Sequence, residues 1–211
     1  MFYRTDQDHG LAHDPLSALV MPRPIGWISS QDSSGHRNLA PFALFNIVAY
    51  RPPHVMFAPT GQPGKSFKDS LTNVEATGEF VTNLATWELR DAVWQSSIPA
   101  PPHIDEFEIT GLTPISSEMV APPRVKESPV HLECRHVQTI RLPHEDQSTA
   151  NHVVIGKVVV VHIDDAVITD GLVDESKLDP IARLGYLNYT RLTEVHAKPF
   201  PVWPPQEPSV R

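Results

Sequence analysis

The fold of this chain is decided by residues 21–53, MPRPIGWISSQDSSGHRNLAPFALFNIVAYRPP. Pro22 and Pro24 exclude a helix at the start of this stretch, because proline has no N–H donor and restricts the residue before it. Residues 25–30 form a short run rich in residues that favour strands. A DSSG turn signal follows at residues 32–35. The apolar run then resumes over residues 39–49, and a Pro-Pro pair ends it. The stretch therefore predicts two strands joined by a turn.

Length and composition are those of a single globular domain, with 211 residues, 40% hydrophobic and 20% charged. The net charge of −8 argues against a nucleic-acid binder, which needs clustered Lys and Arg. One cysteine excludes an internal disulfide framework. No leader-like apolar segment and no run near roughly 18 apolar residues is present, so we expect a cytoplasmic protein without membrane contact. We expect residues 1–13 to form an N-terminal arm and residues 194–211 a proline-rich C-terminal arm.

A high proline count, 22 residues, suits a strand-rich fold with long shaped loops. Many short strands with few helices predict a mainly β, antiparallel barrel. We expect further strands over residues 55–58, 79–85, 131–142 and 152–163, one near Ile115, and one over 187–192 that closes the sheet. Short helices are expected over residues 14–20, from Ser66 to a stop at Gly78, and over 88–96.

The order of the motifs carries a resemblance. RPIGWISS, an Asp and a Gly, NLAPFALFN and the prolines at 52–53 resemble the signature of the flavin reductase-like family, the FMN-binding split barrels. Later segments agree in order: KDS at 68–70, GEFVTNL at 78–84, IGKV at 155–158, and Pro180 with RLG at 183–185 and Tyr189. The resemblance covers most of residues 15–192. It implies an antiparallel split barrel of Greek-key type with peripheral helices.

Polar residues on the first two strands have two interpretations. They are either edge-strand residues that face water, or groups that bond the ribityl chain and the pyrimidine edge of a flavin. The family often has Tyr-Ser at positions 42–43 and Thr at positions 30 and 70, so we expect a modest affinity for flavin here. The FMN contacts that the resemblance implies are Trp27, Ile28, Ser29, Ser30, Asn38, Ala40, Pro41, Phe42, Ala43, Asn46, Ser66, Lys68, Asp69 and Ser70.

Gly64-Lys65-Ser66 looks like the end of a P-loop, but Pro59 stands where that motif requires glycine. What remains is a glycine-containing loop before a helix, which suits an anion because the first N–H groups of a helix carry partial positive charge. An ordinary capped surface helix is the alternative. The resemblance favours the anion site, because it implies that residues 68–70 lie at the FMN phosphate.

The segment HLECRH at 131–136 suggests a metal site at first sight. Side chains alternate along a strand, so His131 and Glu133 point to one face and Cys134 and His136 to the other. These four cannot chelate one ion together. We expect structural residues here, and no metal.

The catalytic residues are not evident from the sequence. His152 is a substrate-side candidate, since related flavin reductases can carry a histidine near this point. In those relatives it stands one residue earlier, where this chain has Asn151, and a one-residue shift changes the face of a strand. We therefore favour a solvent-facing histidine at a strand end. Arg183 and Tyr189 are candidates for a substrate or dimer contact.

The resemblance implies a homodimeric NAD(P)H:flavin oxidoreductase that binds FMN and passes electrons to a partner monooxygenase or another acceptor. NADH or NADPH would bind transiently, because the sequence has no G-x-G-x-x-G fingerprint. Two alternatives stay open. One is an enzyme that holds FMN tightly and acts directly on an organic substrate, with residues 99–129 shaping its pocket. The other is a flavin electron carrier without nicotinamide turnover.

Overall fold

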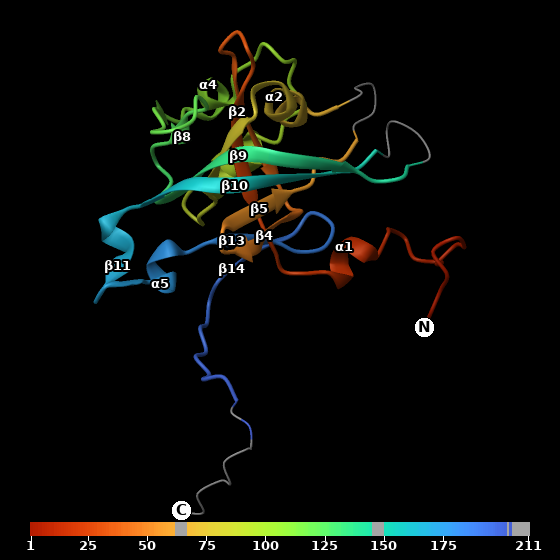
Figure 1. The fold of residues 1–211 in the computed structure, drawn as a ribbon. Coiled ribbons are helices and arrows are strands. Elements are labelled where there is room, and N and C mark those ends of the chain that lie inside the picture. Colours follow the sequence, from red (N-terminus) through yellow and green to blue (C-terminus); the bar gives the residue numbers. More distant parts are fainter. Residues whose placement is uncertain (62–66, 145–149, 202, 204–211) are drawn as a thin grey trace, which may run out of the picture.

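The computed structural model describes residues 1–61, 67–144, 150–201 and 203. One seven-stranded antiparallel sheet dominates it (Figure 1). The strands expected over residues 131–142 and 152–163 are both present, and they pair with each other at its centre. In spatial order the strands are β3 (Arg37–Phe42), β2 (Gly26–Gln31), β6 (Glu79–Leu84), β9 (Val130–Arg141), β10 (His152–Ile163), β5 (Pro53–Phe57) and β4 (Phe45–Tyr50).

The two outermost strands of this sheet are consecutive in the chain. Only Ala43 and Leu44 separate the end of β3 from the start of β4. The sheet must therefore curl until its edges approach. Gly26 of β2 then lies against Phe45 of β4, and a Cβ on Gly26 would be 2.5 Å from the Phe45 ring. The result is a barrel whose seam is closed by side chains rather than by a hydrogen-bonded ladder.

The expectation of one strand over residues 39–49 is wrong. The chain leaves β3 after Phe42 and restarts in β4 at Phe45, because it must cross from one edge of the sheet to the other. Both halves are apolar, so the sequence shows no break at this point.

The barrel interior holds the main core. Phe57 and Phe80 meet there with ring centroids 5.3 Å apart, and Cys134 joins them. Gly156 on β10 leaves space for Phe80, because a Cβ at position 156 would lie 2.3 Å from its ring. Helix α2 (Asp69–Thr77) packs Leu71 and Val74 against the same core. As expected, α2 ends at Gly78, which takes a left-handed conformation. It begins later than expected, and Ser66 lies outside the described residues.

A second core lies on the outer face of β2, β3 and β6. Its centre is Trp27, fully buried, whose indole N–H donates to Ser96 Oγ at 2.9 Å. Val93 of α3 (Arg90–Gln95) and Phe107 of α4 (Glu106–Thr110) cover it. The sequence analysis missed α4, although Asp105 caps its start and Gly111 its end.

Smaller elements complete the chain. The expectation that residues 187–192 close the main sheet is wrong, because β14 (Tyr189–Arg191) pairs in a separate three-stranded sheet. Helix α1 falls inside the expected range 14–20. No helix of the described ranges is long and apolar enough to cross a membrane. The remaining elements are α1 (Leu16–Leu19), β1 (Arg23–Pro24), β13 (Ile181–Arg183) and β14 (Tyr189–Arg191), β7 (Pro114–Ile115) with β8 (Arg124–Val125), η2 (Asp165–Val167), β11 (Ile168–Thr169), β12 (Leu172–Val173) and α5 (Glu175–Leu178).

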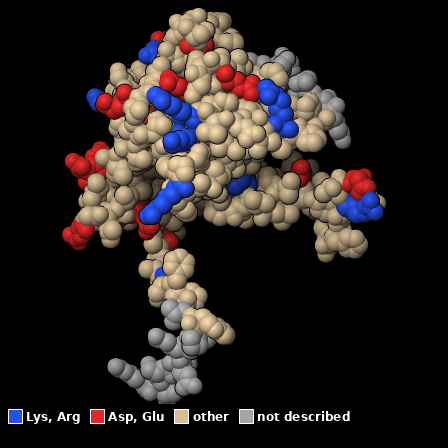
Figure 2. Space-filling view, in the orientation of Figure 1, with Lys and Arg blue, Asp and Glu red and all other residues tan. Residues whose placement is uncertain are grey.

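The C-terminal arm leaves the body of the protein as an extended chain (Figure 1), and Figure 2 shows it standing clear of the rest of the surface. Phe200 and Trp203 in this arm are almost fully exposed. Residues 202 and 204–211 lie outside the described ranges.

Candidate functional site

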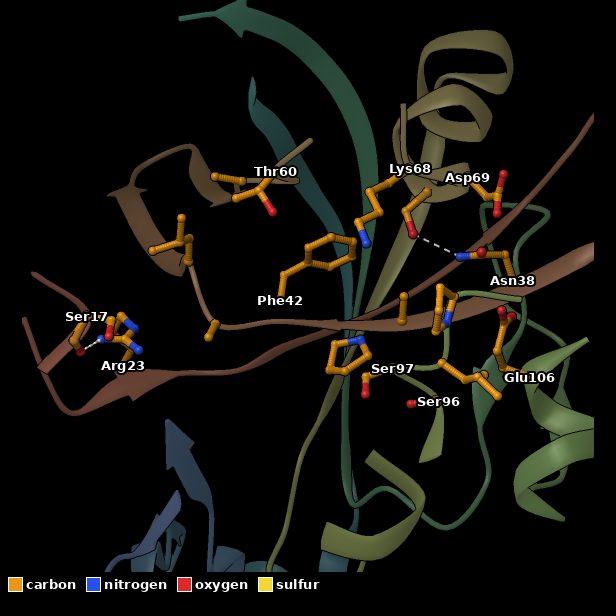
Figure 3. A pocket seen from close by; sticks show the side chains of 18 of the residues that line it. Ser17, Arg23, Asn38, Phe42, Thr60, Lys68, Asp69, Ser96, Ser97 and Glu106 are labelled. Carbon is orange, nitrogen blue, oxygen red and sulfur yellow. Dashed lines mark hydrogen bonds between the residues drawn. The ribbon is translucent and has the colours of Figure 1, made fainter. Parts of the chain in front are cut away.

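A cavity of about 670 Å³ lies beside β3, where the barrel seam meets the start of α2 (Figure 3). Its size is that of a pocket for a small organic ligand. Three further segments wall it: α1 with its flanking residues, the end of β5, and the link between α3 and α4. The lining residues are Asp14, Leu16, Ser17, Val20, Arg23, Asn38, Ala40 to Leu44, Ala58, Thr60, Lys68 to Ser70, Ser96 to Ala100, and Glu106.

One end of the cavity carries hydrogen-bond donors and a positive charge. Lys68 is the extended residue just before α2, and Figure 3 shows its ammonium group reaching over the cavity towards Phe42. Asp69 and Ser70 form the first turn of the helix, where backbone N–H groups have no partner inside the helix. These donors, the helix dipole and the lysine charge together favour a negatively charged group.

A buried polar network holds this end in place. The Asn38 side-chain amide donates to Ser70 Oγ at 2.9 Å and to Ser30 Oγ at 3.3 Å. Asn73 of α2 also donates to Ser30 Oγ, at 3.2 Å. Because Ser70 Oγ accepts a hydrogen from Asn38, its hydroxyl can turn its own hydrogen towards a ligand acceptor in the cavity. The network thus joins β2, β3 and α2 and sets the direction of the Ser70 hydroxyl.

The middle of the cavity is mainly apolar. Residues 40–44 form one wall, in which Phe42 is fixed by its contact with Phe57 at 5.0 Å between ring centroids. Residues 96–100 face this wall from the link between α3 and α4 (Figure 3). Apolar walls with a few polar groups at the ends suit a flat aromatic ligand that carries an anionic tail.

Glu106, the first residue of α4, also lines the cavity. Its carboxylate Oε2 accepts a hydrogen bond from the Leu39 N–H at 3.0 Å. Burial raises the pKa of Glu106, and the charge of Asp69 raises it further. The sequence analysis missed this residue, because residues 105–108 read as part of an acidic, irregular segment.

Part of the predicted FMN set meets in this cavity and part does not. Trp27, Ile28, Ser29 and Ser30 are buried within the sheet and do not line it; Ser29, for example, donates to the Pro123 carbonyl. Asn46 is exposed on β4, away from the lining. The predicted residues that do line the cavity are Asn38, Ala40, Pro41, Phe42, Ala43, Lys68, Asp69 and Ser70.

The expectation that His152 faces solvent is wrong. The residue is only 4% exposed, and its ring packs edge-on against Phe67 at 5.3 Å between centroids. It shares the inward face of β10 with Val154 and Gly156, because side chains alternate along the strand. Burial lowers the pKa of His152, and the nearby Arg141 charge acts in the same direction. His152 does not line the cavity.

Arg183 and Tyr189 lie on the small sheet, where the Arg183 guanidinium stacks on the Tyr189 ring at 4.6 Å. Neither lines the cavity, but the turn between them supports its wall. Gly185 in that turn touches α1 so closely that a Cβ would lie 2.4 Å from the Ala18 side chain. Arg23, at the cavity edge, donates to the Leu184 carbonyl at 2.8 Å.

The residues of segment 131–136 hold a loop in place. Glu133 is fully buried and accepts from the N–H groups of Glu118 and Met119 and from His162 Nε2, each at 2.7 Å. His131 Nε2 pairs with the Val125 carbonyl at 2.8 Å. Within the described ranges, no group of three or more His, Cys, Asp or Glu side chains is arranged to hold a metal ion.

Comparison with known proteins identifies the class. The model of the flavin reductase like domain matches residues 17–182. An uncharacterized protein of Aquifex aeolicus is 36% identical over 191 residues, which cover 90% of this chain and 94% of that protein. This chain therefore belongs to the flavin reductase-like family.

Solved structures agree with this assignment. Nitrilotriacetate monooxygenase component B from Bacillus cereus is 31% identical, with a TM-score of 0.86 over 94% of this chain and 98% of that chain. Pseudomonas fluorescens 2-nitrobenzoate 2-nitroreductase is 26% identical, with a TM-score of 0.77 over 92% of each chain. A Shewanella frigidimarina protein with a split barrel domain is 23% identical and has a TM-score of 0.77, over 95% of this chain and 99% of that chain. The predicted antiparallel split barrel is confirmed.

The Glu133 contacts generate a stability prediction. Burial alone would raise the pKa of Glu133, but its hydrogen bonds from Glu118, His162 and Met119 outweigh burial and hold the pKa below its usual value. A lowered carboxyl pKa stabilises the fold above the unfolded-state pKa, and this contribution is lost as pH falls through the folded-state value. Glu133→Gln should therefore cost about 1.5–3 kcal/mol at pH 7.

Urea unfolding measures this loss. The difference between Glu133→Gln and wild type should shrink as pH falls below about 4.3, the usual pKa of a glutamate. Glu88→Gln, at an exposed position, is the control and should change stability little. If Glu133→Gln lowered the free energy of unfolding equally at pH 7 and at pH 3, this would contradict the conclusion that Glu133 is an ionised, hydrogen-bonded carboxylate in the folded protein.

Proposed function

We propose that this protein binds FMN in the cavity beside β3 and acts as an NAD(P)H:flavin oxidoreductase that delivers electrons to a partner monooxygenase or another acceptor. One observation carries the proposal. In a chain of the flavin reductase-like family, a single cavity combines hydrogen-bond donors and a positive charge at Lys68 and Ser70 with apolar walls at residues 40–44 and 98–100.

The residues present fit FMN. Lys68, Ser70 and the first N–H groups of α2 would hold the phosphate, since all of them are donors and Lys68 adds a full charge. The wall around Phe42 would pack against the ring system. When bound, the flavin supplies the redox chemistry, accepting a hydride from NADH or NADPH and passing electrons onward. The protein's part is to orient the cofactor and to exclude water from it.

The solved relatives suggest where the electrons go. One of them is a component of a monooxygenase, which favours an acceptor protein for this chain as well. A second candidate is direct reduction or oxygenation of an organic substrate. It is favoured by the extent of the cavity, which reaches beyond the predicted flavin contacts to Ser17 and Arg23 at one end (Figure 3).

A second copy of the chain would complete the site. Leu16 and Val20 line the cavity and yet are 61% and 62% exposed, and Leu44 beside them is exposed as well. Val48 on the edge strand β4 is a further exposed apolar residue, at 51%. Apolar groups around a cofactor site are stabilised when a partner covers them. We therefore propose a homodimer, in which Arg183, Tyr189 and the C-terminal arm remain candidates for the contact.

The first prediction of the proposed function concerns the phosphate. Lys68→Ala should weaken FMN binding by about 1.5–3 kcal/mol, the value of a hydrogen bond to a charged group, and should leave riboflavin binding nearly unchanged. Equilibrium dialysis with both flavins measures this. Lys177→Ala, on the exposed surface of α5, is the control and should alter neither affinity. Equal losses for FMN and riboflavin would place Lys68 away from the phosphate, and no FMN binding by wild type would reject the proposed function.

The second prediction separates the reductase from its alternatives. Under anaerobic conditions NADH or NADPH should bleach the absorbance of bound FMN in stopped-flow mixing. His152→Ala should keep most of that rate per bound FMN, because His152 packs against Phe67 outside the cavity. If neither nucleotide reduces the flavin, the protein acts directly on another substrate or carries electrons only. A rate that collapses in His152→Ala would instead make that histidine part of the reaction.

The third prediction concerns assembly. Sedimentation at micromolar concentration should show a species of twice the 23.5 kDa chain mass. Val48→Glu should dissociate it and weaken FMN binding, because a buried charge is costly in an interface. Leu172→Glu, at a 73% exposed position on β12, is the control and should stay dimeric. A wild-type monomer that still binds FMN would contradict the dimer.

A further inference from the structure

The end of the cavity at Lys68 also contains acidic groups. Glu106 lines it together with Lys68, Asp69 and Ser70 (Figure 3). The Glu106 residue is 5% exposed, and its Oε2 is held by the Leu39 N–H at 3.0 Å. Its position is therefore fixed by the backbone of β3, and the carboxyl cannot swing out into water without losing that hydrogen bond.

Like charges from two neighbouring residues act on Glu106. Asp69 at the start of α2 and Asp105 on its own helix both act on it as like charges. Arg37 of β3 donates a hydrogen bond from its Nε to Asp105 Oδ2 at 2.6 Å. On α3, the neighbouring charges Arg90 and Asp91 approach each other at 3.7 Å.

Positive charge inside the cavity is limited. Among the described residues that line it, the cations are Lys68 at this end and Arg23 at the other. Arg23 donates to the carbonyls of Ser17, Val20 and Leu184. Among the described lining residues, a phosphate at the Lys68 end therefore shares the cavity with the ammonium group of Lys68 and the carboxyl groups of Asp69 and Glu106. Like charges brought together in a desolvated site cost affinity.

We propose that Glu106 is a proton-linked specificity residue of this cavity. When Glu106 is protonated, an anionic group can bind beside Lys68. When Glu106 is ionised, its charge repels that group. The inference rests on the proposed function, with the FMN phosphate as the anion. A protonated Glu106 can donate through its second oxygen while Oε2 still accepts from Leu39. The proton comes from solvent.

The pH dependence has a defined sign. Burial raises the pKa of Glu106, so its proton is lost at higher pH than from an ordinary glutamate. The repulsion grows as pH rises through that pKa. The FMN phosphate itself loses its second proton near pH 6, which strengthens the contact to Lys68 and acts in the opposite direction. A comparison of two variants at the same pH cancels this second effect.

The experiment measures FMN and riboflavin dissociation constants for wild type and Glu106→Gln from pH 5 to pH 9. Glutamine keeps an acceptor for the Leu39 N–H and cannot ionise. We expect the FMN affinity of Glu106→Gln, relative to that of wild type, to rise with pH as Glu106 ionises in the wild type, by about tenfold for one pKa unit of linkage. Riboflavin, which has no phosphate, should bind both proteins equally at every pH.

Glu108→Gln is the matched control, because Glu108 lies on the same helix with its side chain 80% exposed. It should follow wild type throughout. The role of Glu106 would be overturned if the ratio of FMN affinities between Glu106→Gln and wild type stayed constant with pH, or if the same ratio for riboflavin changed equally. Either result would leave FMN binding itself standing. No FMN binding by wild type at any pH would overturn the proposed function and this inference with it.

Discussion

The contact between Gly26 and Phe45 is the constraint on which the rest of the structure depends. Strands β3 and β4 are the two edges of one sheet, and only Ala43 and Leu44 separate them in the chain. The edges can approach only if β2 allows the Phe45 ring to lie directly on its backbone, which requires the missing side chain of Gly26. The same principle acts on the far side of the barrel, where Gly156 makes room for Phe80. Two glycines thus set the curvature that ordinary pleated strands would resist.

The cavity is a consequence of this closure. Because no hydrogen-bonded strand pair closes the seam between β3 and β4, backbone and side chains of β3 are left uncovered by the sheet. Helices α2 and α1 and the link between α3 and α4 lie around this exposed part of β3. The network of Asn38, Ser70, Ser30 and Asn73 then fixes the first turn of α2 against β2 and β3. Buried amides and hydroxyls are tolerated here because they satisfy one another, and a half-satisfied network would cost more than an apolar one. The Lys68 end is therefore rigid before any ligand arrives.

Much of this fold could be predicted from local chemistry. Turn residues after residue 31, the stop at Gly78 and the β-branched run over 152–163 each act within a few residues, and each prediction holds in the structure. The break at Ala43 could not be predicted in this way, because residues on both sides are apolar and only the curl of the sheet separates them. The burial of His152 could have been predicted, because His152 and Gly156 are an even number of residues apart and therefore lie on the same face of β10. The lining of the cavity depends on contacts between distant segments, so only the structure shows that Glu106 and Lys68 line the same cavity.

The charged groups of the cavity affect its affinity for anions and its selectivity among anionic ligands in different ways. A site with Lys68, Ser70 and the α2 N–H groups alone would hold any small anion, since backbone donors and a lysine charge do not distinguish one phosphate from another. In the role proposed for Glu106, its carboxylate and that of Asp69 lower this general attraction, because like charges in the cavity cost an anion affinity. A free anion gains only the polar contacts, whereas a ligand with a flat apolar portion also gains the walls at residues 40–44 and 98–100. The acidic groups therefore favour ligands that use the whole cavity over those that use only its charged end, and this discrimination needs no contact beyond those already present.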